Sequence, residues 1–334
     1  MLTLISGANP VLRAQSSGLL VGIRQVDGDS QAYRTIWIAP QQGKLRVVAD
    51  GPDLVVPGRT GFFRVCVVTA QSLDDGELSI SDSVLVQPAT PRRGSCAHPV
   101  SKTPVGKARC ESRERETITF ASGMFLSVAE RGDYDCGVHP ASNELEGVRS
   151  LAGSSVDLDS LFTREQRQAF ASLALAAAKA RFGDLGTFDS AAVADPGSEA
   201  RLAVEGPAGI HRGDGRWMLT GSASCSSCGM MPLIYPIPDF ILPARVVGHD
   251  TVGATAVAAK RRYPNASDVM ASPSGDVVAV VRDGRLLVFA PTGAEPGAPV
   301  LDVASGDIVM LQWATGRFTD VWSRTLREIL GKPR

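Results

Sequence analysis

The order of elements is clearest in the stretch that begins with Ile118-Thr-Phe-Ala-Ser-Gly-Met-Phe-Leu-Ser-Val128. This mostly apolar run predicts a strand. It leads to Asp135-Cys-Gly-Val-His-Pro140, where glycine and proline favour a turn at the end of the strand. The apolar-spaced Val156-Asp-Leu-Asp-Ser-Leu-Phe162 then comes directly before a predicted helix over residues 163–182. Strand, turn and helix in this order make Ile118–Phe182 the best marker of the fold.

The helix over residues 163–182 has signals at both ends. Gln166 follows Thr163 by three residues, a capping-box pattern that pairs the free amide groups at a helix start. Gly183 is a suitable residue to end the helix. The side chains predicted to face a sheet are those of Phe170, Leu173, Ala177 and Ala180.

Apolar runs separated by short turns dominate the sequence on both sides of this stretch. Asn, Asp and Gly tolerate the positive φ angles of tight hairpin turns, so Asp-Gly pairs predict hairpins. The predicted turns are Asp27-Gly28, Gln41-Gln-Gly43, Asp50-Gly51 and Asp283-Gly284. We therefore predict an α+β fold, predominantly antiparallel β with one main helix at about 163–182. The alternative is a β-propeller with a helical insertion.

Shifts in composition divide the chain into five predicted segments. Residues 92–116 are rich in charge and nearly free of large apolar groups, which is typical of a linker or long loop. The hairpins of the last segment include a predicted strand at Phe318–Trp322. The predicted segments are a truncated leader (1–17), an N-terminal β-meander domain (18–90), a linker or disulfide-stapled loop (91–116), a central α+β domain (117–250) and a C-terminal β-hairpin domain (251–334).

Composition limits the classes of partner and compartment. The chain has 44% apolar and 21% charged residues, as in ordinary globular proteins, and a formal net charge of −1. Such a charge gives no field that attracts nucleic acid or an anionic membrane. No run reaches the roughly 20 apolar residues that a spanning helix needs. Leu12-Arg-Ala14 before Gln15 resembles a signal-peptidase site, so we predict an exported, extracytoplasmic (periplasmic or secreted) protein.

An even number of cysteines agrees with export, because disulfides persist in oxidising compartments. Six cysteines allow 15 pairings, and the sequence does not choose among them. Cys96 and Cys110 flank the charged loop, where a disulfide would act as a staple. The disulfide candidates are Cys66, Cys96, Cys110, Cys136, Cys225 and Cys228.

The motif Cys225-Ser-Ser-Cys228 has the spacing of thioredoxin-type redox sites. Such sites lie at a helix start, which lowers the pKa of the thiol. Pro232 and Pro236 follow too closely for that helix to form, so a structural disulfide is favoured. A zinc site of Cys136, His139, Cys225 and Cys228 is the alternative, because two pairs with this spacing suit tetrahedral coordination. We predict no cofactor.

Standard catalytic patterns are absent from the sequence. It contains neither a Gly-x-Ser-x-Gly elbow nor a phosphate-binding glycine loop. The pair Asp133 and Asp135 could serve acid–base chemistry if it lay in a cleft, but solvated loop carboxylates are the more common case. The tripeptides Arg131-Gly-Asp133 and Arg212-Gly-Asp214 are interpreted as turns.

The central region resembles the extracytoplasmic domains of RsiV-like anti-sigma factors, which sense lysozyme, and of some peptidoglycan deacetylases. Cys136-Gly-Val-His139 stands for the Gly-Ala-His element of that family, and Val156–Phe162 with the helix for the next elements. Asp214-Gly-Arg-Trp-Met-Leu219 with Tyr235-Pro-Ile237 stands for the last element. The resemblance covers roughly residues 118–250 and implies an α+β domain with a sensory or binding role outside the cytoplasm.

The C-terminal hairpins resemble the blades of WD40-like and TolB-like propellers. Ala271-Ser-Pro-Ser-Gly-Asp276 and the following Asp283-Gly284 turn carry this resemblance. It implies a propeller that serves as an interaction scaffold.

These observations favour a non-catalytic binding or sensory module of the bacterial cell envelope. Its binding residues are predicted to be Tyr134 and His139 with Asp133 and Asp135, at the end of the first strand of the marker stretch. An envelope-glycan-acting enzyme with a carboxylate-lined cleft is one alternative, and the propeller scaffold is the other. The envelope ligand or partner and the oligomeric state stay open, and no nucleic-acid partner or transmembrane segment is expected.

Overall fold

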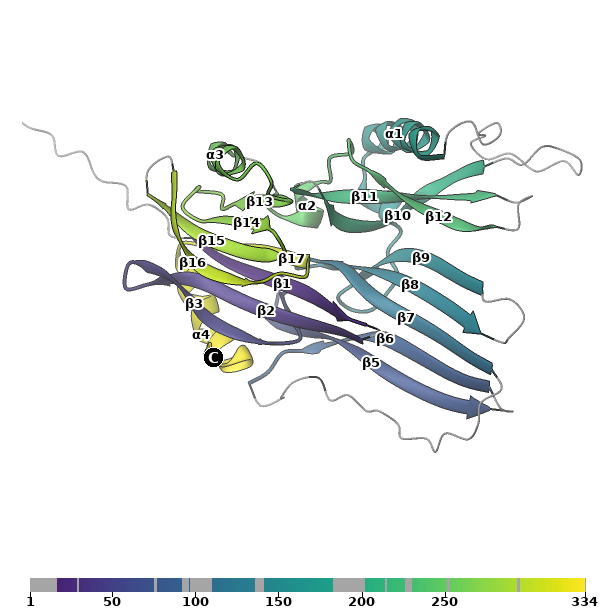
Figure 1. The fold of residues 1–334 in the computed structure, drawn as a ribbon, viewed down its shortest axis with the longest axis horizontal. Coiled ribbons are helices and arrows are strands. Elements are labelled where there is room, and N and C mark those ends of the chain that lie inside the picture. Colours follow the sequence, from purple (N-terminus) through teal and green to yellow (C-terminus); the bar gives the residue numbers. More distant parts are fainter. Residues whose placement is uncertain are drawn as a thin grey trace, which may run out of the picture.

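The computed structural model describes residues 17–28, 30–74, 77–91, 96, 110–135, 141–182, 202–213, 215–225, 230–250, 253–292 and 295–333. Strands predominate in these residues and form a mixed ten-stranded sheet and two smaller antiparallel sheets, with few helices (Figure 1). The predicted α+β class with a predominance of β structure is confirmed.

Sheet A is the ten-stranded sheet, in the order β3-β2-β1-β17-β7-β6-β5-β4, with β8 and β9 following on the other side of β7. Strand β4 contacts β1 and β2 although it ends the strand order, so the sheet curls into a half-barrel. Its strands are β1 (Ser17–Asp27), β2 (Ser30–Gln41), β3 (Lys44–Pro52), β4 (Leu54–Pro57), β5 (Phe62–Asp74), β6 (Glu77–Pro88), β7 (Cys110–Ala121), β8 (Phe125–Asp135), β9 (Ala141–Ser150) and β17 (Asp307–Thr315).

Two smaller antiparallel sheets and the helices complete the fold. Sheet B comprises β10 (Leu202–Gly213), β11 (Arg216–Cys225) and β12 (Met230–Ile237). Sheet C comprises β13 (Asp268–Ala271), β14 (Val278–Arg282), β15 (Arg285–Thr292) and β16 (Glu295–Ala304). The helices are η1 (Leu158–Leu161), α1 (Arg164–Phe182), α2 (Ala244–Val247), α3 (Ala254–Arg262) and α4 (Arg317–Leu330). Sheet C resembles one blade, but the curled ten-stranded sheet shows that the propeller alternative is wrong.

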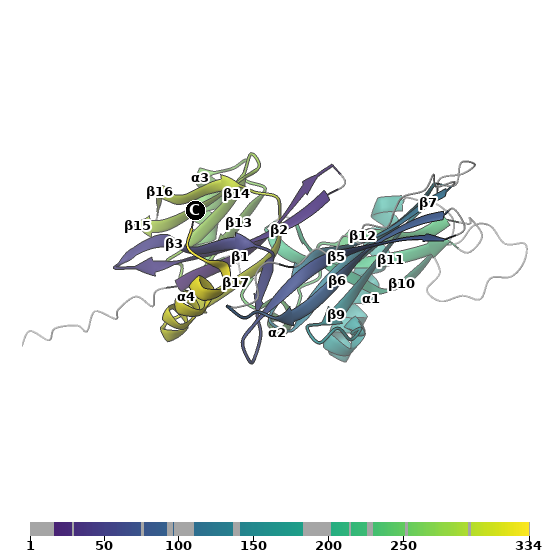
Figure 2. The same cartoon turned by 90° about the horizontal axis from the view of Figure 1, so that it is seen from below.

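The elements stack in layers. Sheets B and C lie side by side above sheet A, with α1 over sheet B and α3 over sheet C, while α4 covers the opposite face of sheet A (Figure 1). Figure 2 shows an elongated molecule, with sheet C near β1–β3 at one end and sheet B near β7–β9 at the other. The largest apolar cluster fills the space between sheet A and the two smaller sheets, and a second lies between sheet A and α4. Stacked layers of this kind bury one face of every sheet.

Tight turns follow the predicted glycine chemistry at two hairpins. Gln42 and Gly43 join β2 to β3, and Asp283 and Gly284 join β14 to β15; all four have φ between 51° and 76°. Positive φ at both central residues is the geometry that matches the twist of paired strands.

The predicted turn at Asp50-Gly51 is wrong. Strand β3 runs through both residues, and the turn lies at Asp53, which has a φ of 70°. A Cβ atom on Gly51 would lie 2.8 Å from the carbonyl oxygen of Leu330 in α4. Gly51 is therefore needed because α4 approaches the backbone of β3, and not because of a turn.

Helix α1 begins as its sequence predicts, and Gly183, the residue predicted to end it, lies outside the described residues. The backbone N–H of Gln166 donates to Thr163 Oγ1 (3.2 Å), and the backbone N–H of Thr163 donates to Gln166 Oε1 (2.9 Å), which completes the capping box. The buried side chains of the helix are those of Phe170, Ala174 and Ala178. Ala180 is exposed, so the buried face lies slightly to one side of the predicted stripe.

Helix α4 replaces the strand predicted at Phe318–Trp322, and that prediction is wrong. Phe, Val, Thr and Trp favour strands, but their preference is weak against tertiary packing. Thr319, Ser323 and Leu326 recur at helical spacing and are buried against sheet A. Ser323 Oγ accepts a 2.9 Å hydrogen bond from the Trp37 indole, which fixes the helix to the sheet.

A disulfide joins Cys66 in β5 to Cys96, with 5.8 Å between their Cα atoms. The staple considered between Cys96 and Cys110 is therefore wrong, although Cys110 is itself disulfide-bonded. Asp53 accepts hydrogen bonds from the backbone N–H of Cys96 (2.9 Å) and from the Arg64 guanidinium (2.6 Å). The disulfide thus holds residue 96 against the buried ion pair of Arg64 and Asp53.

Strands from the three predicted domains share sheet A, because β17 from the last segment lies between β1 and β7. The predicted linker over residues 91–116 ends earlier than expected, since β7 begins at Cys110. No helix in the described residues is long and apolar enough to cross a membrane.

Candidate binding site

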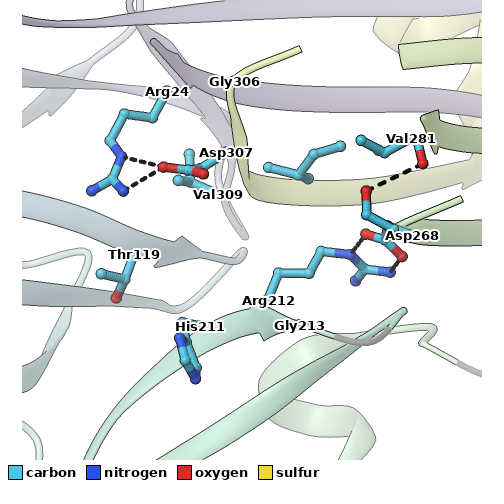
Figure 3. Close-up of a pocket in the computed structure, with 12 residues that line it drawn as sticks. Arg24, Thr119, His211, Arg212, Gly213, Asp268, Val281, Gly306, Asp307 and Val309 are labelled. Atoms are coloured by element: carbon cyan, nitrogen blue, oxygen red, sulfur yellow. Dashed lines mark hydrogen bonds and ion pairs between the residues drawn. The ribbon is translucent and has the colours of Figure 1, made fainter. Parts of the chain in front are cut away.

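A cleft of about 430 Å³ opens where sheets A, B and C meet, and we call it the three-sheet cleft (Figure 3). Volumes of roughly 300–1,000 Å³ are typical of small-molecule sites. It is built from strand ends of β1, β7, β10, β13, β14 and β17, and from the residues just before β13 and β17. Its described lining residues are Arg24, Thr119, His211, Arg212, Gly213, Ser267, Asp268, Val281, Gly306, Asp307, Ile308 and Val309.

Arg212 forms the buried base of one wall. Its guanidinium pairs with both oxygens of Asp268 and donates to Asp250 (3.1 Å), and it lies 5.1 Å from the centre of the Trp217 ring. Burial by itself would lower the pKa of Arg212, but the contacts with Asp268 and Asp250 raise it by more than burial lowers it. The net effect is a raised pKa, so the side chain stays charged. All three nitrogens are occupied, because Nη2 also donates to the Gly215 carbonyl (3.0 Å). Arg212 therefore joins sheet B to sheet C and is not free to bind a ligand.

His211 precedes Arg212 on β10 and carries an unused hydrogen-bonding atom. Its Nε2 is buried and has no hydrogen-bond partner among the described residues. Burial lowers the pKa of His211 below its ordinary value, so the imidazole is neutral at neutral pH. A buried polar atom without a partner is rare in folded proteins and marks a place where a ligand or ordered water binds.

Thr119 lies near His211 on the facing strand β7 (Figure 3). Its hydroxyl donates to the carbonyl of Ile210 (2.8 Å) and lies 2.9 Å from Ser127 Oγ. Ser127 Oγ in turn accepts from the backbone N–H of Ile210 (2.9 Å). These bonds fix β10 on sheet A and thereby place the imidazole of the next residue.

Arg24 and Asp307 form an ion pair at the rim. Arg24 Nε and Nη2 lie 3.1 Å and 2.5 Å from the same oxygen, Asp307 Oδ2. The side chain of Asp307 is 63% exposed and that of Arg24 is 21% exposed, so both are accessible to a ligand. A Cβ atom on Gly306 would lie 1.7 Å from the carbonyl oxygen of Arg24, and the close approach of the two segments thus requires glycine at this position.

The cleft offers groups that recognise a polar molecule rather than groups that attack one. Two of its described lining residues carry alcohols: the Thr119 hydroxyl is held by Ile210 and Ser127, and the Ser267 hydroxyl donates to the Val281 carbonyl (3.2 Å), so neither is held by a base. No acidic side chain of the described residues contacts His211. A nucleophile, a base and an orienting group in contact are what covalent catalysis requires.

The predicted binding residues lie elsewhere, on the end of β8. Tyr134 lines a separate pocket of about 230 Å³ on the concave side of sheet A, together with Glu116 and Glu130. Asp133 faces away from Tyr134, because successive side chains of a strand point to opposite faces, and it pairs with Arg131 (3.2 Å). Asp135 ends the strand. His139, the fourth predicted residue, lies outside the described residues.

Two carboxylates that line the pocket of Tyr134 lie directly opposite each other on adjacent strands. Glu116 in β7 is opposite Glu130 in β8, and Arg149 pairs with both of them at 2.6 Å. A cation shared by two carboxylates relieves the repulsion between like charges on adjacent strands.

The zinc alternative falls largely outside the described residues. Cys136, His139 and Cys228 are not described, and neither is the side chain of Cys225. Within the described residues, no group of three or more His, Cys, Asp or Glu side chains is arranged to hold a metal ion.

Sequence reasoning does not find the three-sheet cleft. Arg24, His211 and Asp307 come from strands far apart in the chain, and none belongs to a local motif. Arg212 was interpreted as part of a turn, whereas it is the centre of a buried ionic cluster.

No protein-family model matches this chain, and no curated protein matches it in sequence. The resemblances carried by its motifs stay predictions.

Proposed function

We propose that this protein is a non-catalytic binding or sensory module of the bacterial cell envelope, and that its ligand occupies the three-sheet cleft. One observation carries the proposal: the buried Nε2 of His211 has no partner in the described part of the chain, and His211 lines a cleft large enough for a small molecule. A ligand that bonds to this nitrogen would remove the cost of leaving it unpaired, which is about 1–3 kcal/mol for a buried polar group.

The position of the cleft supports a sensory role. A ligand there would touch β1 and β17 of sheet A, β10 of sheet B, and β13 and β14 of sheet C at the same time. Binding would thus favour the arrangement of the three sheets in which these contacts form.

The disulfide between Cys66 and Cys96 supports an extracytoplasmic location, since such bonds are rare in the cytosol of most organisms. Cys110 is also disulfide-bonded.

Thermal unfolding with a panel of small molecules tests the proposal. The probes are amino acids, short peptides, mono- and disaccharides, and soluble peptidoglycan fragments. A ligand at a hundred times its Kd adds about 2.7 kcal/mol to the free energy of unfolding. We expect one probe class to raise the Tm of the wild type but not of Val281→Phe, which fills the cleft.

Val300→Phe is the matched control, because Val300 is 39% exposed on β16 and does not line the cleft. The control should respond to the probes as the wild type does. A panel in which no probe raises the Tm, or in which Val281→Phe responds like the wild type, contradicts the proposal.

An enzyme acting on an envelope glycan is the second candidate. It is favoured by Glu116 and Glu130, which lie opposite each other in the pocket of Tyr134. Release of soluble fragments from peptidoglycan by the wild type, and its loss in Glu130→Gln, would support this activity over simple binding. Glu144→Gln, which changes an exposed carboxylate on β9 that does not line this pocket, controls for the change of surface charge.

A further inference from the structure

The charges and apolar groups of the three-sheet cleft indicate the class of ligand. We propose that it binds a small zwitterion, namely an α-amino acid with an aliphatic side chain. This inference rests on the proposed function, because it assigns the ligand of the same cleft.

The rim pair supplies one binding group of each charge. Arg24 uses Nε and Nη2 on a single oxygen of Asp307, and its Nη1 has no partner among the described residues. The other oxygen of Asp307, Oδ1, is likewise unpaired in the described part of the chain. A carboxylate on Arg24 Nη1 and an ammonium on Asp307 Oδ1 would form charge-assisted hydrogen bonds, which are roughly twice as strong as neutral ones.

The spacing of the pair limits how far apart the charges of the ligand can be. Arg24 Nη2 and Asp307 Oδ2 are in contact at 2.5 Å, so their unpaired atoms belong to adjacent groups. A ligand that meets both groups must carry its own two charges close together. The ammonium and carboxylate of an α-amino acid are attached to one carbon atom and meet this condition.

The balance of charge favours a zwitterion over an ion of one sign. Arg212 has its charge compensated by Asp250 and Asp268, and Arg24 is compensated by Asp307. The uncharged imidazole of His211 adds no net field. A ligand with a single charge would therefore gain an interaction with one member of the rim pair and be repelled by the other.

Part of the lining of the cleft is aliphatic. Val281 and Ile308 line the cleft and belong to the same apolar cluster. None of the described lining residues is Phe, Tyr or Trp, so the broad stacking surface that sugars and bases use is missing from this part of the chain. A branched aliphatic side chain would remove apolar surface from water at Val281 and Ile308.

His211 provides a third contact on the wall opposite the rim pair (Figure 3). A neutral imidazole nitrogen either donates or accepts one hydrogen bond, so Nε2 suits the carboxylate in one tautomer and the ammonium in the other. Three fixed contacts would also distinguish the two mirror forms of the amino acid.

Calorimetric titration of the whole protein with L-leucine tests the inference. Two further probes each lack one charge: 4-methylpentanoate has no ammonium, and 3-methylbutylamine has no carboxylate. Glycine retains both charges but has no side chain. We expect L-leucine to bind at least about tenfold more tightly than each single-charge probe, which is the effect of losing one charged hydrogen bond. Glycine should also bind at least about tenfold more weakly, because it buries no apolar side chain.

Two variants assign the contacts. Asp307→Asn should weaken L-leucine by about tenfold but should not weaken 4-methylpentanoate, because that probe has no ammonium to lose and is no longer repelled by Asp307. Arg24→Gln should weaken L-leucine but should not weaken 3-methylbutylamine, for the corresponding reason. The controls are Asp302→Asn and Arg285→Gln, which alter a similar exposed ion pair on sheet C (48% and 49% exposed) that does not line the cleft. Circular dichroism checks that each variant is folded.

The outcomes separate this inference from the proposed function. If L-leucine fails to bind while a saccharide or peptidoglycan fragment raises the Tm in a manner abolished by Val281→Phe, the zwitterion is wrong and the binding function stands. If no probe binds in the cleft, both are wrong. Equal effects of Asp307→Asn on L-leucine and 4-methylpentanoate would also overturn the assignment of the ammonium contact.

Discussion

Replacing Arg212 by methionine should be among the most damaging single changes in this protein. The guanidinium is 5% exposed, and it pairs with two carboxylates that are 12% and 11% exposed, those of Asp250 and Asp268. Methionine preserves much of the side-chain volume but leaves both carboxylates without their cation. Burial already raises the pKa of Asp250, and Arg212 is what opposes that rise.

The expected loss is about 3–5 kcal/mol in the free energy of unfolding, the range found when one partner of a buried ion pair is removed. The same change at Arg285, which pairs with Asp302 on the surface, should cost no more than about 1 kcal/mol. Adding Asp250→Asn and Asp268→Asn to Arg212→Met should restore much of the lost stability, because the triple variant contains no unpaired charge.

Urea unfolding followed by tryptophan fluorescence measures these differences, and Trp217 lies beside the altered site. The cost of Arg212→Met should be smaller at pH 4.5 than at pH 7.5. Without Arg212, the folded-state pKa of Asp250 lies further above its unfolded value, so the penalty is present at high pH and shrinks as this carboxyl group is protonated. If Arg212→Met costs no more than Arg285→Met, or if the triple variant is less stable than the single one, the ionic cluster does not hold the sheets together.

Three further changes test other parts of the fold. Removing the disulfide with Cys66→Ser and Cys96→Ser, which are 30 residues apart, should lower the free energy of unfolding by about 3.5 kcal/mol in urea titrations, and a loss below 1 kcal/mol would show that it adds little. Gly51→Ala should cost about 1–3 kcal/mol, because its Cβ would lie 2.8 Å from the Leu330 carbonyl oxygen, whereas Gly147→Ala meets no atom within 4 Å and should be nearly neutral. Glu146→Gln should stabilise the protein by on the order of 1 kcal/mol at pH 7.5, because burial and nearby Glu144 raise the pKa of this carboxyl while the hydrogen bond from Thr220 opposes the rise. This gain should shrink as the pH falls and Glu146 is protonated, and a gain that grows toward low pH would contradict it.

Local chemistry predicts the local parts of this fold well. The capping box of Thr163 and Gln166, and the glycine turns at Gly43 and Gly284, are set by residues close together in the sequence. Their effects do not depend on what packs against them. The overall α+β class follows from the same signals.

The wrong predictions of local structure have one cause in common, which is contact between segments that are far apart in the sequence. Asp50-Gly51 has the composition of a turn, but Gly51 is there to let α4 approach β3. Phe318–Trp322 has the composition of a strand, but α4 buries its helical face on sheet A. Weak local preferences are overridden in both cases by packing that the sequence does not display.

The candidate site is also formed by contact between distant segments. The cleft exists only because β1, β10 and β17 meet in space, and its useful atoms are those of Arg24, His211 and Asp307. The residues that the sequence favoured, Tyr134 and Asp133, share a strand but point to opposite faces. Spacing along a chain therefore predicts a site only where its residues lie on the same face of one element.

The place of β17 in sheet A has a consequence for how the protein folds. This strand pairs with β1 over Ser17–Arg24 and lies between β1 and β7, so nearly the whole chain separates the partners of one central ladder. Loop closure over such a length must precede the pairing, which makes it a slow step. Until it occurs, β1 and β7 expose strand edges in the middle of the future sheet, and such edges pair readily with other chains. A chain that lacks residues 307–315 would therefore be expected to aggregate rather than form a smaller stable domain.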